Sequence, residues 1–437
     1  MLTVSAGLSA SAAWTAGVTA LCAIWWATEA IPLPATALIP IGVFPLVGVL
    51  DAEAVASAYG SQLILLFLGG FLLSKAMECS GAHRRIALQL VNWVGGSPRR
   101  LVFAFLLAAG ALSMWVSNTA TALMLLPVAL ATIERVEDRN LRVGVLLAVA
   151  YGSSIGGMGT PIGSPPNLVF LEVYRTTTGV AMSFVEYMTI ALPAVILLLP
   201  LAALWLTRRV TSTEPVNLPE TGRWAVDERR VMIIFALTAL AWITRGDPFG
   251  GWSQWFGLHT ANDASVALVA AVALFLVPNG RGGRLLDWES AASIPWGMLI
   301  LFAGGIVIAK AFSASGLSTA IGDLLAGVGA LPVVLLLLMI CLGVTFLTEV
   351  NSNTATAVLL MPVLAAAALA NELDPRLLMI PAALSATCAF MLPVATPPNA
   401  VVFGSGSIRV QTMIREGFAL NLIGALVITT VCYLRLA

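Results

Sequence analysis

Two short polar motifs recur within an otherwise apolar chain. Ser117-Asn118-Thr119 and Ser352-Asn353-Thr354 are each followed by Ala-Thr-Ala, and one lies in each half of the sequence. Amide and hydroxyl groups carry no charge, but their N–H and O–H bonds can hold an anion, and their oxygens can coordinate a small cation. The motifs therefore predict an ion site that is built without charged side chains.

A second motif also occurs twice, once after each copy of the first motif. Its two copies are separated by almost the same number of residues as the two copies of the first. Gly163-Ser164-Pro165-Pro166-Asn167 corresponds to Ala395-Thr396-Pro397-Pro398-Asn399. Proline breaks a helix, and a helix that restarts presents free N–H groups and partial positive charge to an anion. Because both pairs occur in the same order, we interpret the chain as two homologous halves, each with a polar hairpin tip and a broken helix.

The groups in these motifs suit two kinds of ligand. Donors for an anion come from Asn118, Thr119, Asn353 and Thr354. Hard oxygen ligands for a small cation come from the hydroxyls and unwound carbonyls of Ser113, Ser117, Thr348, Gly163 and Ala395. Neither hairpin interior contains Lys or Arg. A bound anion must therefore be held by helix dipoles and co-bound cations.

Composition predicts an all-α polytopic membrane protein. Hydrophobic residues make up 59% of the 437 positions and charged residues 10%, whereas a soluble domain carries roughly 25% charged residues. Many apolar stretches reach the ~20 residues that cross a hydrocarbon core. The formal net charge of zero gives no nucleic-acid footprint, and the two histidines cannot build a metal cluster with each other.

Arginine placement predicts an inverted repeat. The apolar stretch 101–132 has arginines on both flanks, so both ends are cytoplasmic and the stretch is a re-entrant hairpin. The flanks of 331–370 hold a single arginine, so this second hairpin enters from outside. The resulting topology places sixteen arginines inside and four outside.

The predicted layout has two scaffold segments and two repeats. Residues 1–60 and 231–294 are scaffold helices, and 208–230 is a cytoplasmic connecting loop. The first repeat, 61–207, holds a hairpin at about 101–132 and a broken helix at about 143–174, with a basic loop after residue 80. The second repeat, 295–437, holds a hairpin at about 331–370, a broken helix at about 377–404 and a last helix at about 412–434.

Several other interpretations compete with an ion site. A single Ser-Asn-Thr is more often a contact between helices, but its repetition beside a Pro-Pro-Asn break reverses that preference. An intramembrane enzyme would need a nucleophile with a base or a metal cluster, and neither histidine is near a motif. An anion channel would show a ring of basic side chains. Glu349, an intramembrane carboxylate, is either functional or a structural acceptor within its hairpin.

At these motifs the chain resembles the divalent anion/sodium symporter family of di- and tricarboxylate and sulfate transporters. The resemblance runs from about residue 8 to the C-terminus. Besides the four motifs above, it rests on Trp25-Trp26-Ala27-Thr28-Glu29-Ala30-Ile31-Pro32, Pro295-Trp296-Gly297 and Phe346-Leu347-Thr348-Glu349. Family members usually have one more transmembrane helix before this point. That helix is either absent or lost by truncation of the start, and without it the arginine count predicts an N-terminus on the outside.

The resemblance implies a multi-pass homodimer in the lipid of the cytoplasmic membrane, with a mobile transport domain that moves as an elevator. It implies two or more sodium ions, no organic cofactor and a small dianionic substrate. One sodium would be held by Ser113, Ser117, Asn118 and Gly163, and another by Thr348, Asn353 and Ala395. The substrate carboxylates would meet Asn118, Thr119, Ser164, Asn353, Thr354, Thr396 and Pro397.

The expected function is sodium-coupled symport of C4-dicarboxylates such as succinate. The alternatives are a sodium-independent dicarboxylate exchanger and a symporter of sulfate or tricarboxylates. Backbone and hydroxyl donors fit all of these anions equally. The residues alone therefore leave the substrate open.

Overall fold

The computed structural model describes residues 9–214, 216, 222–246, 251–325 and 331–437. Outside this part lie residues 1–8 and 247–250 of the predicted scaffold segments, residues 215 and 217–221 of the predicted connecting loop, and residues 326–330 of the predicted second repeat. Within it the secondary structure is helical, and the β interaction recorded is one isolated bridge between Pro278 and Arg284. The prediction of an all-α fold is confirmed.

The helices follow one another with short connections. In chain order they are α1 (Ala10–Thr28), α2 (Leu33–Leu46), α3 (Ala52–Tyr59), α4 (Gln62–Ser80), α5 (Ala82–Val94), α6 (Pro98–Ser113), α7 (Asn118–Ile133), α8 (Arg139–Gly157), α9 (Pro165–Thr178), α10 (Phe184–Thr207), α11 (Val226–Ile243), α12 (Gly251–Trp255), α13 (Asp263–Leu276), α14 (Trp288–Ala292), α15 (Trp296–Ser315), α16 (Leu317–Leu324), α17 (Val333–Thr348), α18 (Asn353–Ala370), α19 (Pro375–Ala386), α20 (Pro397–Gly404) and α21 (Val410–Leu436).

Six segments are long and apolar enough to cross a membrane. They are Ala10–Thr28, Ala52–Ser80, Phe184–Thr207, Trp296–Ser315, Asn353–Ala370 and Val410–Leu436. Shorter apolar helices, including α7 and α17, lie between them. A helix of about 16 residues extends only about 24 Å, less than the roughly 30 Å of hydrocarbon. The chain is therefore a multi-pass membrane protein that combines full spans with shorter elements.

Both predicted hairpins are present as pairs of helices. α6 and α7 meet at a turn over residues 114–117, and α17 and α18 meet at a turn over 349–352. The first and last residues of α17 are shifted along the chain from those of α6 by the same number of positions that separates Asn353 from Asn118. The two polar motifs thus begin the second helix of each hairpin.

The two broken helices are interrupted before their prolines rather than at them. α8 ends at Gly157 and α9 begins at Pro165, while α19 ends at Ala386 and α20 begins at Pro397. Proline is favoured in the first turn of a helix, where its missing N–H has no partner to lose. The prolines therefore start the second half-helices, and the unwound segments precede them.

The prediction of a basic loop after residue 80 is wrong, because this stretch forms the helix α5. Gly81 ends α4 with φ of 76°, and its counterpart Gly316 ends α15 with φ of 77°. Glycine adopts this left-handed conformation without strain. Ala87 and Val91 form part of the buried face of α5, and the arginines that follow Ala82 hid this helical spacing in the sequence.

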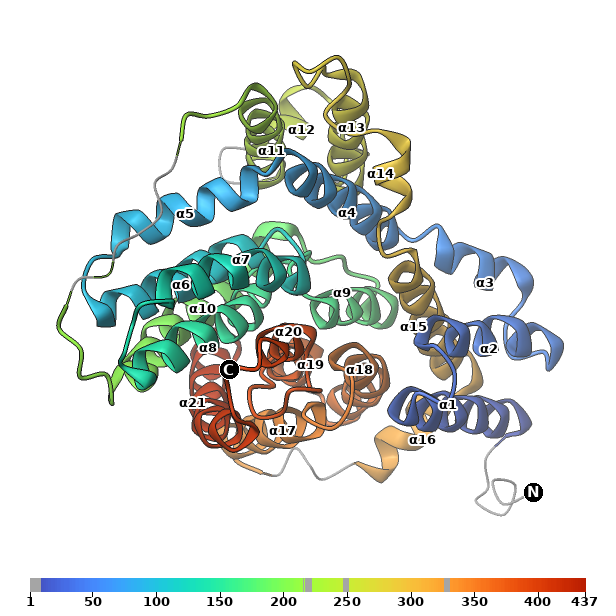
Figure 1. Cartoon of the computed structure of the whole chain (residues 1–437). Helices are drawn as coiled ribbons and strands as arrows, with labels where there is room; N and C mark the ends of the chain where they lie inside the picture. Colours follow the sequence, from blue (N-terminus) through green and yellow to red (C-terminus); the bar gives the residue numbers. More distant parts are fainter. Residues whose placement is uncertain (1–8, 215, 217–221, 247–250, 326–330) are drawn as a thin grey trace.

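The helices form a central bundle with two flanking groups (Figure 1). The bundle contains α6 to α10 and α17 to α21, which are drawn in green and in orange to red. α4, α11 and α13 lie on one flank, and α1, α2 and α15 lie on another. Close glycine contacts join each flank: a Cβ on Gly69 of α4 would lie 2.5 Å from Ala267, and one on Gly304 of α15 would lie 2.7 Å from Ala37. These two glycines occupy equivalent positions in the two halves and so belong to the repeat.

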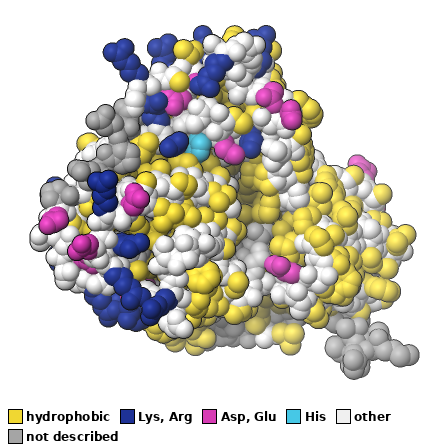
Figure 2. All heavy atoms as spheres, in the orientation of Figure 1, with side chains coloured by type: hydrophobic (Ala, Val, Ile, Leu, Met, Phe, Trp, Pro, Cys, Tyr) yellow, Lys and Arg dark blue, Asp and Glu magenta, His cyan; other side chains and the backbone are white. Residues whose placement is uncertain are grey.

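Arginine side chains mark one end of the bundle. Figure 2 shows Lys and Arg gathered at the lower left, over the region of α8 and α21 in Figure 1. The buried carboxylate of Glu416 pairs with Arg208 at 2.6 Å and with Arg415 at 2.9 Å. Such clusters favour the cytoplasmic boundary, which is where the arginine count places the end of α10 and the start of α21.

Candidate ion site at the meeting point of the two halves

A cavity of about 1060 Å³ lies where both hairpin tips and both broken helices meet. Its walls include the start of α7 at Asn118, the start of α18 at Asn353, and the stretches 162–165 and 394–398. The flanking groups complete it with residues of α1, α4 and α15, among them Trp26 and Phe67. Elements that are far apart in the sequence thus share one site.

Most of the predicted site residues line this cavity. They are Ser117, Asn118, Thr119, Gly163, Ser164, Asn353, Thr354, Ala395, Thr396 and Pro397. Ser113 and Thr348 do not line it; both are buried behind the tips. The structure therefore brings ten predicted residues to one surface and places two in the layer behind it.

The two buried hydroxyls make equivalent contacts. Ser113 Oγ donates to Asn118 Oδ1 at 2.5 Å, and Thr348 Oγ1 donates to Asn353 Oδ1 at 2.8 Å. Ser113 and Thr348 are themselves equivalent positions of the repeat, since each ends the first helix of its hairpin. Each hydroxyl therefore fixes the orientation of the asparagine amide that faces the cavity.

Four helices begin at the cavity wall, and each has a Ser or Thr at its N-cap. The N-caps are Ser117 for α7, Ser164 for α9, Ser352 for α18 and Thr396 for α20. Ser117 Oγ accepts from Ala120 N at 3.2 Å, and Thr396 Oγ1 accepts from Asn399 N at 3.3 Å. Each N-terminus contributes up to about half a positive charge, so the helices give the cavity wall a field that favours anions.

The side chains that line the cavity add no positive charge to this field. Among the described lining residues there is no Lys, Arg or His, whereas Glu29 and Glu349 are both present. Net side-chain charge at the wall is therefore negative or, with bound cations, neutral. A dianion gains electrostatic compensation here only from helix dipoles and from cations that bind with it.

Ser164 makes a contact that its motif did not indicate. Its hydroxyl lies 3.2 Å from Thr387 Oγ1, and both residues are buried. Thr387 caps the end of α19, in the opposite repeat. Sequence reasoning missed Thr387, because the equivalent position of the first half is Ile155 and the repeat therefore gave no signal.

Asn167 and Asn399 were left out of the predicted site, although both belong to the repeated Pro-Pro-Asn motif. Both are fully buried. Asn167 Nδ2 donates to Gly157 O at 2.9 Å and Thr160 O at 2.8 Å. Their repetition in the sequence was the signal that could have identified them.

Glu349 is a hydrogen-bond acceptor whose donors lie outside its own hairpin. Oε1 accepts from Met391 N at 2.8 Å and from Asn421 Nδ2 at 2.7 Å, and Oε2 accepts from Leu392 N at 3.0 Å. The carboxylate thus connects the second tip to the unwound segment before α20 and to α21. The predicted acceptor role is present, but it joins elements rather than stabilising the hairpin internally.

The cavity reaches the ends of two flanking helices that the arginine count places on the cytoplasmic side. Thr28 ends α1 and Glu29 follows it, Ser293 and Pro295 precede α15, and all four line the cavity. Glu29 and Ser293 are exposed. This end of the cavity is therefore its mouth.

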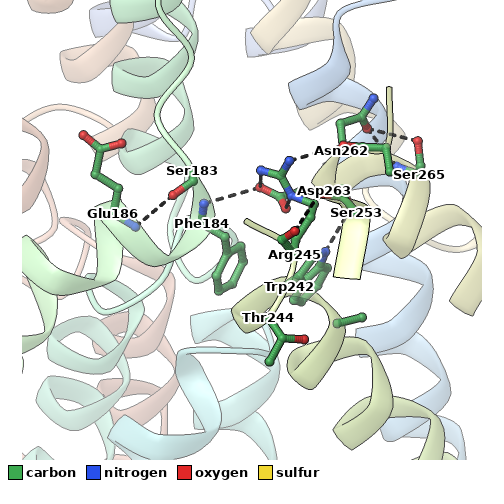
Figure 3. A network of polar contacts seen from close by, with 12 residues as sticks. Ser183, Phe184, Glu186, Trp242, Thr244, Arg245, Ser253, Asn262, Asp263 and Ser265 are labelled. Atoms are coloured by element: carbon green, nitrogen blue, oxygen red, sulfur yellow. Dashed lines mark hydrogen bonds and ion pairs between the residues drawn. The ribbon is translucent and has the colours of Figure 1, made fainter. Parts of the chain in front are cut away.

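Two further contacts join the bundle to its flanks, through residues that do not line the cavity. Ser61 at the start of α4 donates to Glu172 of α9 at 2.9 Å. Figure 3 shows a second contact, in which Asp263 of α13 accepts from Phe184 N at 3.3 Å and pairs with Arg245 at 2.6 Å. The side chains of Arg245 and Asp263 point toward one another beside the start of α10 (Figure 3).

Comparisons with known proteins agree with this architecture. The family model described as "Citrate transporter" matches residues 23–375 and 334–437. The solved structure of the YdaH transporter from Alcanivorax borkumensis has a TM-score of 0.64 and 15% identity, covering 95% of this chain and 98% of that chain. The similarity to the YdaH structure shows that the two proteins share a fold.

Curated relatives match almost the whole chain. The sodium-dependent dicarboxylate transporter SdcS of Staphylococcus saprophyticus is 39% identical over 451 residues, covering 98% of this chain and 86% of that protein. SdcS of Staphylococcus aureus is also 39% identical, over 441 residues that cover 95% of this chain and 84% of that protein. These relatives are transporters rather than enzymes, and the resemblance noted from the motifs is confirmed. The chain is a multi-pass protein of the cytoplasmic membrane and belongs to the citrate transporter family, among the divalent anion/sodium symporters.

Proposed function

We propose that this protein is a secondary active transporter that moves C4-dicarboxylates such as succinate together with sodium ions. The observation that carries the proposal is the cavity at the meeting point of the two halves. Four helix N-termini face it, and no cationic side chain occurs among its described lining residues. The SdcS relatives, which are named sodium-dependent dicarboxylate transporters, support the same substrate and ion.

Two or more sodium ions supply the positive charge that the wall lacks. One ion is held by Ser113, Ser117, Asn118 and Gly163, and another by Thr348, Asn353 and Ala395. The hydrogen bonds Ser113–Asn118 and Thr348–Asn353 support these two groups, because they bring a hydroxyl and an amide oxygen together in each half. Neutral oxygens of this kind are suitable ligands for a hard cation.

The substrate carboxylates bind between the two tips. Their donors are Asn118, Thr119, Ser164, Asn353, Thr354 and Thr396, while Pro397, which has no N–H to donate, meets the carboxylates at the positive end of α20. All of these line the cavity. Ser164 also shares its hydroxyl with Thr387, so we assign to it a weaker part in substrate binding than to Thr119 or Thr354. No organic cofactor takes part in this scheme.

Transport proceeds by an elevator movement of the central bundle relative to the flanking helices, in a homodimer embedded in lipid. The moving part comprises α6 to α10 and α17 to α21. The static part comprises α1 to α4 and α11 to α15. Support comes from the position of the cavity, whose ion-binding residues lie on the bundle and whose remaining wall belongs to the flanks. The interface between these groups is where the movement takes place.

Uptake of radiolabelled succinate into proteoliposomes tests the proposal. With an inward sodium gradient we expect accumulation above equilibrium, and with a choline gradient we expect none. Sodium-independent exchange of internal for external succinate would contradict sodium coupling. Competition by unlabelled sulfate or citrate that exceeds competition by succinate would contradict the substrate class.

A further inference from the structure

Asn167 and Asn399 make the same pair of hydrogen bonds in the two halves. Asn167 Nδ2 donates to Gly157 O and Thr160 O, at 2.9 and 2.8 Å. Asn399 Nδ2 donates to Ala389 O and Leu392 O, at 2.9 and 3.0 Å. The acceptors, like the donors, are equivalent positions of the two halves. We call this pair of hydrogen bonds from one amide to two backbone carbonyls the clamp. It is therefore a repeated feature of the fold and not an accident of local packing.

Only the N–H side of each amide is engaged. Asn167 Oδ1 and Asn399 Oδ1 are buried without a hydrogen-bond partner among the described residues. Leaving a buried amide oxygen unpaired costs about 1–3 kcal/mol. A leucine of similar size would avoid that cost, so the two N–H bonds are what these positions require.

In the first half the clamp holds backbone that touches the proposed cation ligands. Thr160 O accepts from Gly163 N at 3.3 Å as well as from Asn167. A Cβ built on Gly157 would lie 2.5 Å from Asn118 Oδ1, and one built on Gly163 would lie 3.1 Å from Ser113 O. Displacement of residues 157–163 would therefore change the positions of Asn118 and Gly163 directly.

The second half has the same connection. Leu392 O accepts from Ala395 N at 3.2 Å as well as from Asn399. Thr348 Oγ1, which orients Asn353, also lies 3.0 Å from Ala386 O at the end of α19, so its single hydroxyl proton is shared between Asn353 Oδ1 and Ala386 O. The unwound segment between Ala386 and Ala395 is thus fixed by Asn399 near its middle and contacts the cation ligands at both ends.

We propose that Asn167 and Asn399 are positioning residues that shape the two sodium sites, each acting through the unwound backbone of its own half. This inference rests on the proposed function. Their amides replace the helical hydrogen bonds that the unwound segments have lost, and thereby hold the carbonyls of Gly163 and Ala395 toward Asn118 and Asn353. Neither asparagine contacts an ion itself in this scheme.

The test compares Asn167→Ala and Asn399→Ala with a matched control, Asn371→Ala. The Asn371 amide also donates to two backbone carbonyls, Leu325 O at 3.1 Å and Ala367 O at 2.8 Å, but it lies at the far end of α18. The first measurement is the rise in melting temperature of the purified protein with sodium, because an ion that binds the folded state stabilises it. It needs neither substrate nor transport.

We expect Asn167→Ala and Asn399→Ala each to need about tenfold more sodium for half-maximal stabilisation, and the Asn371→Ala control to match the wild type. Uptake assays should show the same tenfold shift in the sodium concentration that gives half-maximal activation, which corresponds to about 1.4 kcal/mol in one binding step. At saturating sodium, the succinate concentration that gives half-maximal uptake should stay within about twofold of the wild-type value. Asn167→Asp, which keeps Oδ1 but loses the N–H donors, should behave like the alanine variant.

The outcomes separate this inference from the proposed function. A wild-type protein that sodium does not stabilise would overturn the proposed function. A wild type that responds, together with asparagine variants whose sodium dependence is unchanged, would overturn the positioning role alone. Variants that fold only in raised sodium support the inference. Variants that fail to fold even in molar sodium count against it, because the asparagines would then hold the whole fold.

Discussion

Ser61 donates a buried hydrogen bond of 2.9 Å to the carboxylate of Glu172, and this bond joins a flanking helix to the central bundle. Ser61 is the N-cap of α4, and Glu172 lies on α9. Arg175 pairs with the same carboxylate at 2.7 Å. In an elevator mechanism this contact exists in the conformation described above and breaks when the bundle moves.

Substitution Ser61→Ala should destabilise this conformation. A hydrogen bond to a charged group is worth about 1.5–3 kcal/mol, so the ratio of the two conformations should change by roughly 10- to 150-fold. Val394 lines the cavity and is 84% exposed, so Val394→Cys in a cysteine-free background reports on the open mouth. We expect cytoplasmic labelling of this cysteine to slow when Ser61→Ala is added.

Ser57→Ala is the matched control for that experiment. Ser57 Oγ accepts from Lys310 Nζ at 2.7 Å, which joins α3 to α15 within the flanking helices. Its loss removes a hydrogen bond to a charged group without touching the bundle. Equal labelling rates in the Ser61 and Ser57 variants would show that the Ser61–Glu172 contact does not govern the conformational equilibrium.

The two hairpins should be accessible from opposite sides of the membrane. Arg100 lies in the first turn of α6, and Asn371 follows α18. Single cysteines at these positions should react with an impermeant thiol reagent from the cytoplasmic and the outer side respectively, because the arginine distribution orients the halves oppositely. Reaction of both from one side would contradict the inverted arrangement.

Asn118→Ala and Asn353→Ala should each abolish coupled uptake while the protein remains folded. Each amide is oriented by a buried hydroxyl and faces the cavity, so its loss removes an ion ligand and a substrate donor together. Even one hydrogen bond to a charged group accounts for about a 10- to 150-fold weakening. Succinate uptake and gel filtration of the same preparations measure both properties, and normal uptake by both variants would refute the site.

Sodium should bind first and raise the affinity for succinate. The described lining side chains contribute only negative charge, and helix termini provide about half a charge each, so bound cations supply the remaining attraction. We expect a coupling free energy of about 1–3 kcal/mol, and the same factor for the effect of succinate on sodium. Calorimetric titration of succinate in sodium and in choline at equal ionic strength measures it. Equal affinities would favour the sodium-independent exchanger.

Glu349→Gln should lower the stability of the folded protein. Glutamine keeps one acceptor oxygen and turns its NH2 group toward donors such as Leu392 N, which then lose their partner. A buried donor left without a partner costs about 1–3 kcal/mol. Thermal unfolding of the variant should occur below that of the wild type, whereas Glu289→Gln, at an exposed position, should have no effect. An unchanged melting temperature for Glu349→Gln would show that its three hydrogen bonds add little to stability.

The sequence by itself determined the repeat, the two hairpins and ten of the residues that line the cavity. Apolar stretches leave few ways to bury backbone polar groups in a membrane, so a polar tip or a proline within such a stretch marks a turn or a break. Asn118 and Asn353 could therefore be identified from position alone, and the constant offset related the two halves. α5 escaped prediction because arginines interrupt its apolar face.

Tertiary structure decided which polar groups contact one another. Ser164 with Thr387, and Glu349 with Asn421, are pairs separated by 223 and 72 residues, and neither has an equivalent in the other half. Their contacts depend on how α9 packs against α19 and how α17 packs against α21, and sequence periodicity does not specify helix packing partners. The same packing places Ser113 and Thr348 behind the tips, where their hydroxyls orient the asparagines, and it makes the two halves chemically unequal although the chain repeats.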